Sequence, residues 1–315
     1  MITTQQLQND FTSGLNEFLD SYPESNLFGP IRYLLSLGGK RIRPILALSV
    51  CNAESGSSSD AIPASIAVEL FHNFTLMHDD IMDNAPLRRG RQTVHEKYNE
   101  NAAILSGDAL FTAAYQAIEL ASPDAVLQLL KILNKTSMEV CEGQQQDLDF
   151  ESLEQVSEEM YLEMIRLKTS VLLAASCAMG AISAGATEDR VELWYEFGEK
   201  LGLAFQIQDD YLDTFGSERD TGKQVGGDIL ADKKTFLFIH ASTHCELPSS
   251  DGLSDAEKIK NVSDAMRASG SDIAAKNLMK SYSDMASIAL DKLALNPSTK
   301  TWFEVLLFSV TERVS

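Results

Sequence analysis

The chain has 315 residues, of which 44% are hydrophobic and only 8 are prolines. This length fits a single large helical bundle, and no shift in composition marks a boundary, so we expect one domain over 1–315. The formal net charge of −20 argues against nucleic acid as a partner and against electrostatic attraction to anionic lipid. No run of eighteen apolar residues occurs and no signal-like N-terminus is present, so we expect a cytoplasmic protein without stable membrane insertion.

Apolar residues recur at helical spacing along most of the chain, and few breakers interrupt them. No segment with the two-residue period of a strand is long enough to indicate a sheet. The sequence therefore favours an all-α fold. Helices are expected over about 4–19, 45–53, 62–84, 102–120, 125–150, 153–182 and 190–215, with an amphipathic segment ending at 37 and a further helix starting near Lys233 and Lys234.

The segment GGKRIRP at 38–44 gathers three basic residues within four positions of an otherwise acidic chain. The two glycines free the backbone here, as a loop that wraps around an anion requires. The segment is interpreted as an anion cradle. The alternative, a glycine that ends a helix followed by ordinary solvated basic residues, stays open at this point.

An acidic motif, HDDIMD at 78–83, closes the predicted helix over 62–84. Asp79 and Asp83 are four residues apart, so in a helix they share one face and their charges repel. Mg²⁺ would relieve this repulsion, because it binds one or two carboxylates together with waters and phosphate oxygens. The segment LRRGR at 87–91 places three basic residues beside the motif. The motif is therefore interpreted as half of a metal-bridged phosphate site.

A second copy of this pattern, DDYLD at 209–213, closes another apolar helical run. A single DDxxD is a weak signal, because aspartates are common at solvated helix ends. Two copies at the ends of two apolar helices are hard to explain in that way. Together they would hold Mg²⁺ ions between facing helices and bind a diphosphate from both sides.

Other polar positions carry weaker signals. Lys168 and Thr169 lead into an apolar run, where a lysine more often extends its head to solvent than binds a ligand. His72 lies two turns before Asp79, and a lone helical histidine is more often structural. The glycine-rich segment 216–227, which contains Lys223, has the composition of a flap over a site.

Taken together, these residues resemble the trans-polyprenyl diphosphate synthases of the short-chain type. The resemblance covers nearly the whole chain. It rests on GGK at 38–40 with RP at 43–44, DDIMD at 79–83 with LRRG at 87–90, GQ at 143–144 with Asp147, KT at 168–169, FQIQDDYLD at 205–213, and TGK at 221–223 with Asp228 and Lys233. It implies an isoprenoid synthase-type bundle of long helices around a deep central cavity, usually as a homodimer.

The resemblance also implies the reaction, which is head-to-tail condensation of isopentenyl diphosphate with an allylic diphosphate such as the dimethylallyl, geranyl or farnesyl ester. The allylic carbon–oxygen bond ionises, and the leaving diphosphate needs a concentrated positive field. Three Mg²⁺ ions are expected, held by Asp79, Asp80, Asp83, Asp209 and Asp213. The same diphosphate would contact Arg88, Lys168, Lys223 and Lys233, with Thr169 and Gln206 stabilising the cation. Isopentenyl diphosphate would bind Lys40, Arg43, His72 and Arg89.

Product length would depend on the residues that precede the first motif, because the growing chain must run beside that helix. Phe74 lies five positions before Asp79, and the small Thr75 lies four positions before it. In the family, this arrangement resembles the type that forms C20, so we expect geranylgeranyl diphosphate, with C15 farnesyl diphosphate as the alternative. The alternative interpretation of Phe74 is that it is an ordinary core residue with no influence on product length.

Two other functions compete with this interpretation. A class I terpene cyclase also ionises an allylic diphosphate with Mg²⁺, but it binds one diphosphate and has no use for the cradle of Lys40, Arg43 and Arg89. A non-catalytic partner subunit of a synthase would be expected to lose metal ligands, whereas both aspartate motifs are complete.

Overall fold

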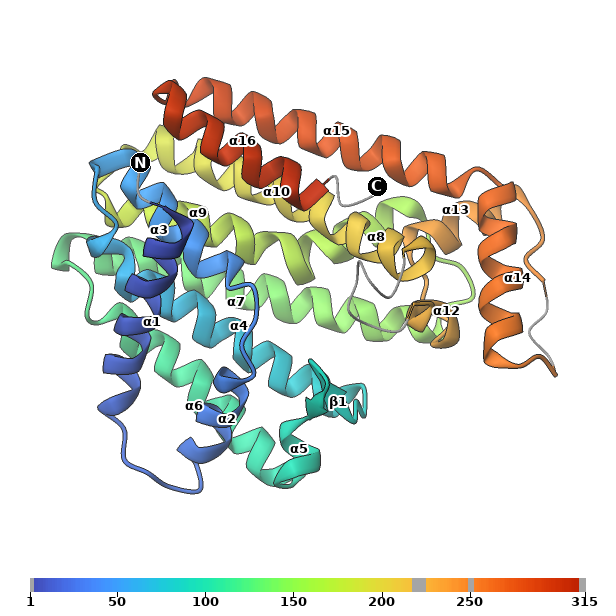
Figure 1. The fold of residues 1–315 in the computed structure, drawn as a ribbon, viewed down its shortest axis with the longest axis horizontal. Helices are drawn as coiled ribbons and strands as arrows, with labels where there is room; N and C mark the ends of the chain where they lie inside the picture. Colours follow the sequence, from blue (N-terminus) through green and yellow to red (C-terminus); the bar gives the residue numbers. More distant parts are fainter. Residues whose placement is uncertain (1–2, 217–224, 249–251, 312–315) are drawn as a thin grey trace. The chain divides into compact units, whose positions relative to one another are not determined.

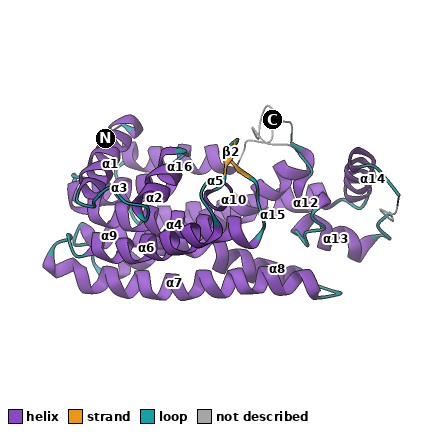
Figure 2. Ribbon diagram, turned by 90° about the horizontal axis from the view of Figure 1, so that it is seen from below, coloured by secondary structure: helices purple, strands orange, loops and turns teal. Residues whose placement is uncertain are grey.

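The structure is a computed structural model that describes residues 3–216, 225–248 and 252–311. Its described elements are helices apart from one short strand pair, so the predicted all-α fold is confirmed (Figures 1 and 2). The chain forms two compact units, which comprise Met1–Lys135 with Ala175–Trp194 and Thr136–Ala174 with Tyr195–Ser315. The long helices α7 (Pro123–Ser152), α9 (Val171–Ser183) and α10 (Glu188–Phe215) each contribute to both units. That the two units form one domain stays a prediction.

The first unit is built around α4 (Ile62–Met82), which packs against α6 (Glu100–Ile118), α3 (Ile42–Ser55) and α1 (Thr4–Asp20) (Figure 1). The first half of α4 is apolar on every side and is buried, as expected of a helix surrounded by others. Gly14 of α1 permits a close approach, because a Cβ there would lie 2.6 Å from Ile62 Cγ2. The remaining elements are α2 (Phe28–Ser36), the 3₁₀ turn η1 (Ser59–Ala61) and α5 (Val94–Lys97).

Helix α4 ends two residues before its predicted end. Asn84 takes a left-handed φ of 47°, and the N–H groups of Asn84 and Ala85 donate to the carbonyls of Ile81 and Asp80. These bonds close the helix in a Schellman motif. The chain then forms a hairpin of β1 (Leu87–Arg88) and β2 (Arg91–Gln92) that the sequence analysis missed, because each strand has only two residues.

The second unit contains α8 (Glu158–Ile165), the π-turn η2 (Arg166–Ser170), α12 (Gly227–Leu230), α13 (Phe236–His244), α14 (Asp255–Ala268), α15 (Ser271–Lys292) and α16 (Pro297–Thr311). Polar caps begin several of these helices; for example, the Ser157 side chain accepts from Met160 N at the start of α8. Large apolar side chains from α8, α10, α13 and α15 form one core cluster, which includes Tyr161, Ile207, Leu237 and Met279.

The single helix predicted over 153–182 is instead a loop, α8, η2 and α9. Among the described residues, the stretch Glu158–Ser183 is long and apolar enough to cross a membrane, but 83% of its most apolar window is buried. This burial is typical of a core helix. The π-turn η2 lies between two glycines: a Cβ on Gly143 of α7 would sit 2.3 Å from Lys168 N, and a Cβ on Gly202 of α10 would sit 2.6 Å from Ser170 Cα. The two glycines therefore let α7 and α10 approach the backbone of η2.

Candidate active site

The first acidic motif separates into an outer pair and an inner aspartate. Asp83 caps the end of α4, and its N–H donates to Asp79 O at 2.8 Å, so the two residues stay one turn apart as predicted. Asp80 is only 1% exposed, and Arg88 binds it with Nε 3.0 and 2.8 Å from its two oxygens and Nη2 2.8 Å from Oδ1. This departs from the expectation that Asp80 is a metal ligand, because its carboxylate already has a cationic partner.

A group of basic side chains forms in the first unit from segments far apart in the sequence. Arg43 Nη1 lies 3.1 Å from His72 Nε2, and the guanidinium of Arg89 lies over Gly39, where a Cβ would approach within 2.6 Å of Nη2. Gly39 has a φ of 132°, which residues with a side chain rarely adopt, and its lack of a side chain leaves room for the Arg89 guanidinium. Arg89 itself has a φ of 53° at the first position of the two-residue hairpin turn, a type of turn that requires positive φ.

The electrostatics of this group favour an anion. Burial lowers the pKa of Arg43 to about 10, and Glu69 opposes this shift. Burial, followed by the charge of Arg43, lowers the pKa of His72 well below its ordinary value, so the imidazole is neutral and accepts from Arg43. Within the described residues, the buried Arg43 Nε has no hydrogen-bond partner. Cations that repel one another and keep an unused donor are suited to bind a diphosphate.

One basic residue of the predicted cradle has an internal role. Arg41 ion-pairs with the buried carboxylate of Glu69 and donates to the carbonyl of Leu35 at 2.6 Å. Asn73 also donates to Glu69, at 2.8 Å. The sequence signal for Glu69 was available, because it is the one acid in an otherwise apolar stretch of α4. Lys40, by contrast, is exposed next to Arg41.

The second acidic motif has the same inner and outer arrangement. Asp209 is exposed on α10, whereas Asp210 is buried and accepts hydrogen bonds from Tyr161 and Gln206. Burial raises the pKa of Asp210 well above its ordinary value and the charge of Asp228 adds to this, while the two hydrogen bonds act in the opposite direction. Asp213 Oδ2 accepts from the backbone N–H of Asp228 at 2.9 Å. The outer positions Asp209 and Asp213 are less buried than Asp210.

The π-turn η2 carries Lys168 and Thr169. Lys168 Nζ lies 2.5 Å from Asp147 Oδ2, and Thr169 Oγ1 donates to Gln206 Oε1 at 3.0 Å. π-turns inside helices often mark functional sites. The sequence analysis missed this one, because RLKTS has no feature that distinguishes it from an α-helical turn.

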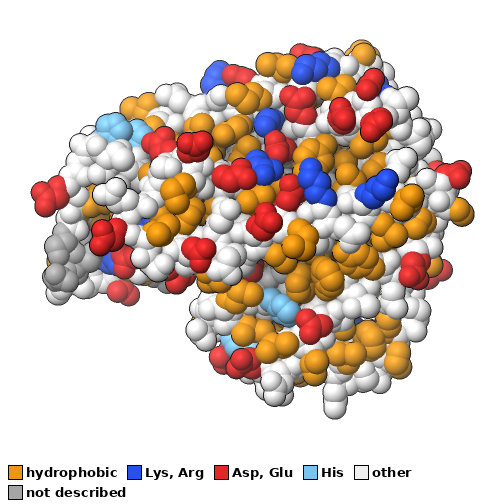
Figure 3. All heavy atoms as spheres, turned by 180° about the vertical axis from the view of Figure 1, so that it is seen from behind, with side chains coloured by type: hydrophobic (Ala, Val, Ile, Leu, Met, Phe, Trp, Pro, Cys, Tyr) orange, Lys and Arg blue, Asp and Glu red, His pale blue; other side chains and the backbone are white. Residues whose placement is uncertain are grey.

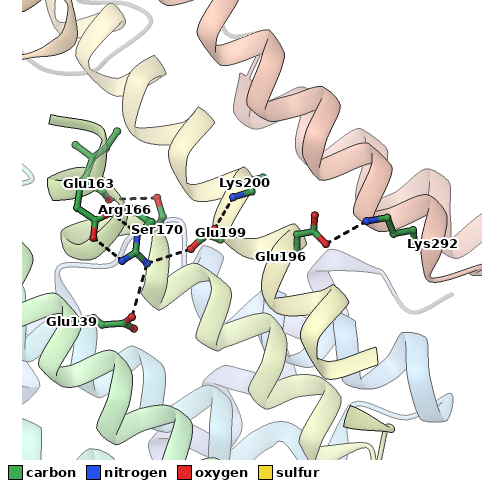
Figure 4. Close-up of polar contacts among 9 residues, drawn as sticks. Glu139, Glu163, Arg166, Ser170, Glu196, Glu199, Lys200 and Lys292 are labelled. Carbon is green, nitrogen blue, oxygen red and sulfur yellow. Dashed lines mark hydrogen bonds and ion pairs between the residues drawn. The ribbon is translucent and has the colours of Figure 1, made fainter. Parts of the chain in front are cut away.

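An ion cluster around Arg166 fixes η2 to its neighbours. The Arg166 side chain reaches Glu163 at 2.7 Å, Glu199 at 3.4 Å and Glu139 at 3.9 Å (Figure 4). These carboxylates belong to α8, α10 and α7, so one side chain connects three helices to the turn. Lys200 pairs with Glu199 at 2.7 Å in the same cluster.

The remaining predicted residues lie in the second unit. Lys233 is half exposed, and its Nζ is 3.9 Å from Asp228 Oδ1. Lys223 and most of the expected flap over 216–227 lie outside the described residues. Among the described residues, no group of three or more His, Cys, Asp or Glu side chains is arranged to hold a metal ion by itself. Each motif offers two outer carboxylates, and this donor set fits Mg²⁺, which completes its coordination with waters and phosphate oxygens.

Comparison with known proteins identifies the family. The profile of the polyprenyl synthetase family matches residues 24–268. The chain belongs to this family. This polyprenyl synthetase is 43% identical to the short chain isoprenyl diphosphate synthase of Methanocaldococcus jannaschii over 253 residues, which cover 79% of this chain and 77% of that protein. It is therefore a prenyltransferase, and the predicted family and activity are confirmed.

Solved structures give the same result. A crystal structure of a geranylgeranyl pyrophosphate synthase superimposes with a TM-score of 0.95 at 40% identity, covering 100% of both chains. The geranylgeranyl pyrophosphate synthase of Corynebacterium glutamicum, solved in complex with isoprenyl diphosphate and magnesium, has a TM-score of 0.89 at 25% identity, covering 99% of this chain and 100% of that one.

Proposed function

We propose that this polyprenyl synthetase condenses isopentenyl diphosphate head-to-tail with allylic diphosphates and releases C20 geranylgeranyl diphosphate as its main product. The observation that carries the proposal is the basic group of Arg43, His72 and Arg89, which contains none of the paired aspartates of the motifs. A diphosphate that is not ionised needs cationic and hydrogen-bonding partners but no metal. The two related structures named as geranylgeranyl pyrophosphate synthases support the C20 product.

The metal ligands follow from the outer positions of the motifs. We propose Asp79 and Asp83 from the first motif and Asp209 and Asp213 from the second, and we leave Asp80 out because Arg88 occupies it. Three Mg²⁺ ions remain the expected number. When bound, Mg²⁺ supplies the positive field that stabilises the leaving diphosphate.

The other site residues are assigned to one or the other of the two substrates. Arg43 and Arg89 hold isopentenyl diphosphate, while the neutral His72 accepts from Arg43 and so orients its guanidinium. Lys40 adds an exposed charge beside them. On the allylic side, oxygen atoms of Thr169 and Gln206 face the developing cation. No side chain is assigned as the base, so the released diphosphate would accept the proton. The allylic diphosphate itself contacts Arg88, Lys168, Lys223 and Lys233.

The competing functions are not favoured. A terpene cyclase binds one diphosphate and would not need the Arg43 and Arg89 group. A non-catalytic subunit would have lost metal ligands, whereas the outer aspartates of both motifs are present.

A purified sample incubated with Mg²⁺, isopentenyl diphosphate and each allylic diphosphate tests the proposal directly. Chromatography of the dephosphorylated products should show a C20 alcohol as the main species, and chelation of the metal should abolish it. A hydrocarbon formed from farnesyl diphosphate alone would instead establish a cyclase. Absence of any elongated product from the folded protein would favour the subunit.

We also propose a homodimer formed through α6 and α7. In the first unit, Tyr115 OH of α6 donates to Asn134 Oδ1 of α7 at 2.9 Å. On α6, on α7 and in the turn between them, Leu105, Leu127 and Leu120 are each about 60% exposed. Apolar side chains also gather between charged ones on the face shown in Figure 3. We propose that these leucines belong to one patch, since contiguous exposed apolar patches mark interaction surfaces.

Light scattering after gel filtration should give a mass of two chains for the wild type and of one chain for Leu105→Lys with Leu127→Lys. The matched control is Val305→Lys, which charges an exposed apolar position on α16 and should stay dimeric. A monomeric wild type would remove the dimer from the proposal.

A further inference from the structure

Tyr161 of α8 has no role in the proposed reaction, yet its environment is unusual for a tyrosine. Its side chain is 1% exposed in the core cluster of the second unit, and its hydroxyl donates to Asp210 Oδ2. Asp210 Oδ1 accepts from Gln206 Nε2 at 2.9 Å, one turn earlier on α10. The buried hydroxyl is therefore the first member of a hydrogen-bond chain that leads to a proposed catalytic residue.

This chain determines which way the Gln206 amide faces. The two ends of a glutamine amide are close in size, so their orientation depends on the partners they meet. Asp210 Oδ1 offers an acceptor, which turns the NH₂ group of Gln206 toward Asp210. The amide oxygen then faces Thr169, whose hydroxyl donates to it at 3.0 Å.

The Thr169 hydroxyl and the Gln206 amide are thus oriented before substrate binds. The single proton of the Thr169 hydroxyl is used on Gln206, so the side of Thr169 that remains open presents oxygen lone pairs. Both Thr169 and Gln206 are only partly buried, whereas Tyr161 and Asp210 are buried behind them. Oxygen dipoles held in place in advance stabilise a developing positive charge without reorganisation during the reaction.

We infer that Tyr161 is a positioning residue that, through Asp210, orients the Gln206 amide so that Gln206 and Thr169 present oxygen atoms to the allylic cation. The inference rests on the proposed condensation. Without the Tyr161 hydroxyl, the Asp210 carboxyl can rotate, and Gln206 can turn an N–H toward the cation.

The kinetic test uses Tyr161→Phe, which keeps the ring in the core and removes only the hydroxyl. Turnover should fall by about 10-fold to 100-fold, as expected when a catalytic group is misplaced rather than removed. The KM of each diphosphate should stay within about twofold, because neither diphosphate group is proposed to contact the hydrogen-bonded residues Tyr161, Asp210 and Gln206. Tyr282→Phe is the matched control: Tyr282 packs against the same core cluster, outside the hydrogen-bond chain, and its loss should leave turnover unchanged.

A double variant of Tyr161 and Gln206 distinguishes a positioning role of Tyr161 from a general contribution to core packing. If Tyr161 acts through Gln206, adding Tyr161→Phe to Gln206→Leu should lower turnover by less than about twofold further, since residues that act as a unit are not additive. Independent loss, in which the double variant shows the product of the two single effects, would overturn the inference. So would a Tyr161→Phe enzyme with normal turnover.

A second readout needs no catalysis. In protein labelled with ¹⁵N in glutamine side chains, the Gln206 NH₂ resonances, assigned by their loss in Gln206→Leu, should shift in Tyr161→Phe and not in Tyr282→Phe. An unmoved Gln206 signal would also overturn the inference. If wild-type protein shows no condensation but the shift occurs, the reaction proposal has failed and the positioning has not. Should Tyr161→Phe not fold, Asp210→Asn replaces it: this change removes one of the two acceptor oxygens that Tyr161 and Gln206 use, so the Gln206 NH₂ resonances should shift, and unmoved resonances would overturn the inference.

Discussion

Arg88 holds the carboxylate of Asp80 through two of its nitrogens, while the adjacent Asp79 lies on a different side of α4. Successive residues of a helix are rotated by about 100°, so neighbours in the sequence have different surroundings. Asp80 thereby connects α4 to the hairpin that follows it, and Asp79 remains one turn from Asp83. We therefore propose different functions for these two adjacent aspartates of one motif.

Substitution by asparagine should separate these functions. Asp79→Asn removes a charge from the proposed metal site, so turnover should fall by about two to three orders of magnitude with little change in the unfolding midpoint. Asp80→Asn weakens a buried ion pair, so the free energy of unfolding should drop by on the order of 2 kcal/mol. Thermal unfolding together with Mg²⁺ titration of activity measures both effects. Equal loss of stability in the two variants would contradict the division.

The basic group should affect one substrate more than the other. Arg43→Ala and Arg89→Ala each remove a charged donor, so the KM of isopentenyl diphosphate should rise by about 10-fold to 100-fold. The KM of the allylic substrate should change little. Arg91→Ala, an exposed arginine of the same hairpin, is the matched control and should resemble the wild type in both constants. A selective effect on the allylic substrate would show that the two diphosphate sites were assigned the wrong way round.

His72 should make the fold sensitive to mild acid. Its pKa is lowered in the folded protein, whereas in the unfolded chain it binds a proton below about pH 6.5. The unfolded state therefore gains more protons as the pH falls, and stability is lost from pH 6.5 down to the lowered folded pKa, by at most about 1.4 kcal/mol per pH unit.

Replacing His72 by glutamine removes this sensitivity while keeping an acceptor for Arg43. Urea unfolding at pH 7.5 and 5.5 should show a smaller drop in stability for His72→Gln than for the wild type. His244→Gln, at an exposed histidine of α13, serves as the control and should keep the wild-type difference. An identical drop in His72→Gln would mean that other groups cause the acid sensitivity.

Much of this site could be predicted from the sequence, because it depends on helical periodicity. The outer pairs at 79 and 83 and at 209 and 213 followed directly from four-residue spacing. The inner positions could have been predicted in the same way: Asp80 lies three residues after the buried Met77, and Asp210 three after the buried Ile207, so each shares a buried face.

Other features depend on contacts between distant segments. The backbone of η2 lies against Gly143 and Gly202 of two neighbouring helices, where a Cβ would clash, and the sequence RLKTS contains no information about these neighbours. The role of Arg41 likewise depends on Glu69, which lies 28 positions later. The local pattern therefore indicated which residues are candidates for the site, but not which of them contact one another.

The surroundings of Phe74 bear on the length of the product. The centroid of the Phe74 ring lies 5.1 Å from that of Phe111 on α6 and 4.9 Å from that of His78. Phe74 therefore belongs to an aromatic cluster of the first unit. Phe111 in turn lies 5.2 Å from Tyr115. We expect a chain growing along α4 to meet Phe74, against which Phe111 is packed.

Phe74→Ala should therefore lengthen the product by one or more five-carbon units, and Phe74→Ala with Phe111→Ala should lengthen it further, because the second ring becomes the floor once the first is removed. Thr75→Phe should act in the opposite direction and favour C15, since it places a ring one residue closer to the motif. Thr75→Val, which adds no length, should leave the product unchanged. Chromatography of dephosphorylated products measures all four. If Phe74→Ala kept the wild-type distribution, Phe74 would be a packing residue of the cluster, and the floor would have to lie on another helix.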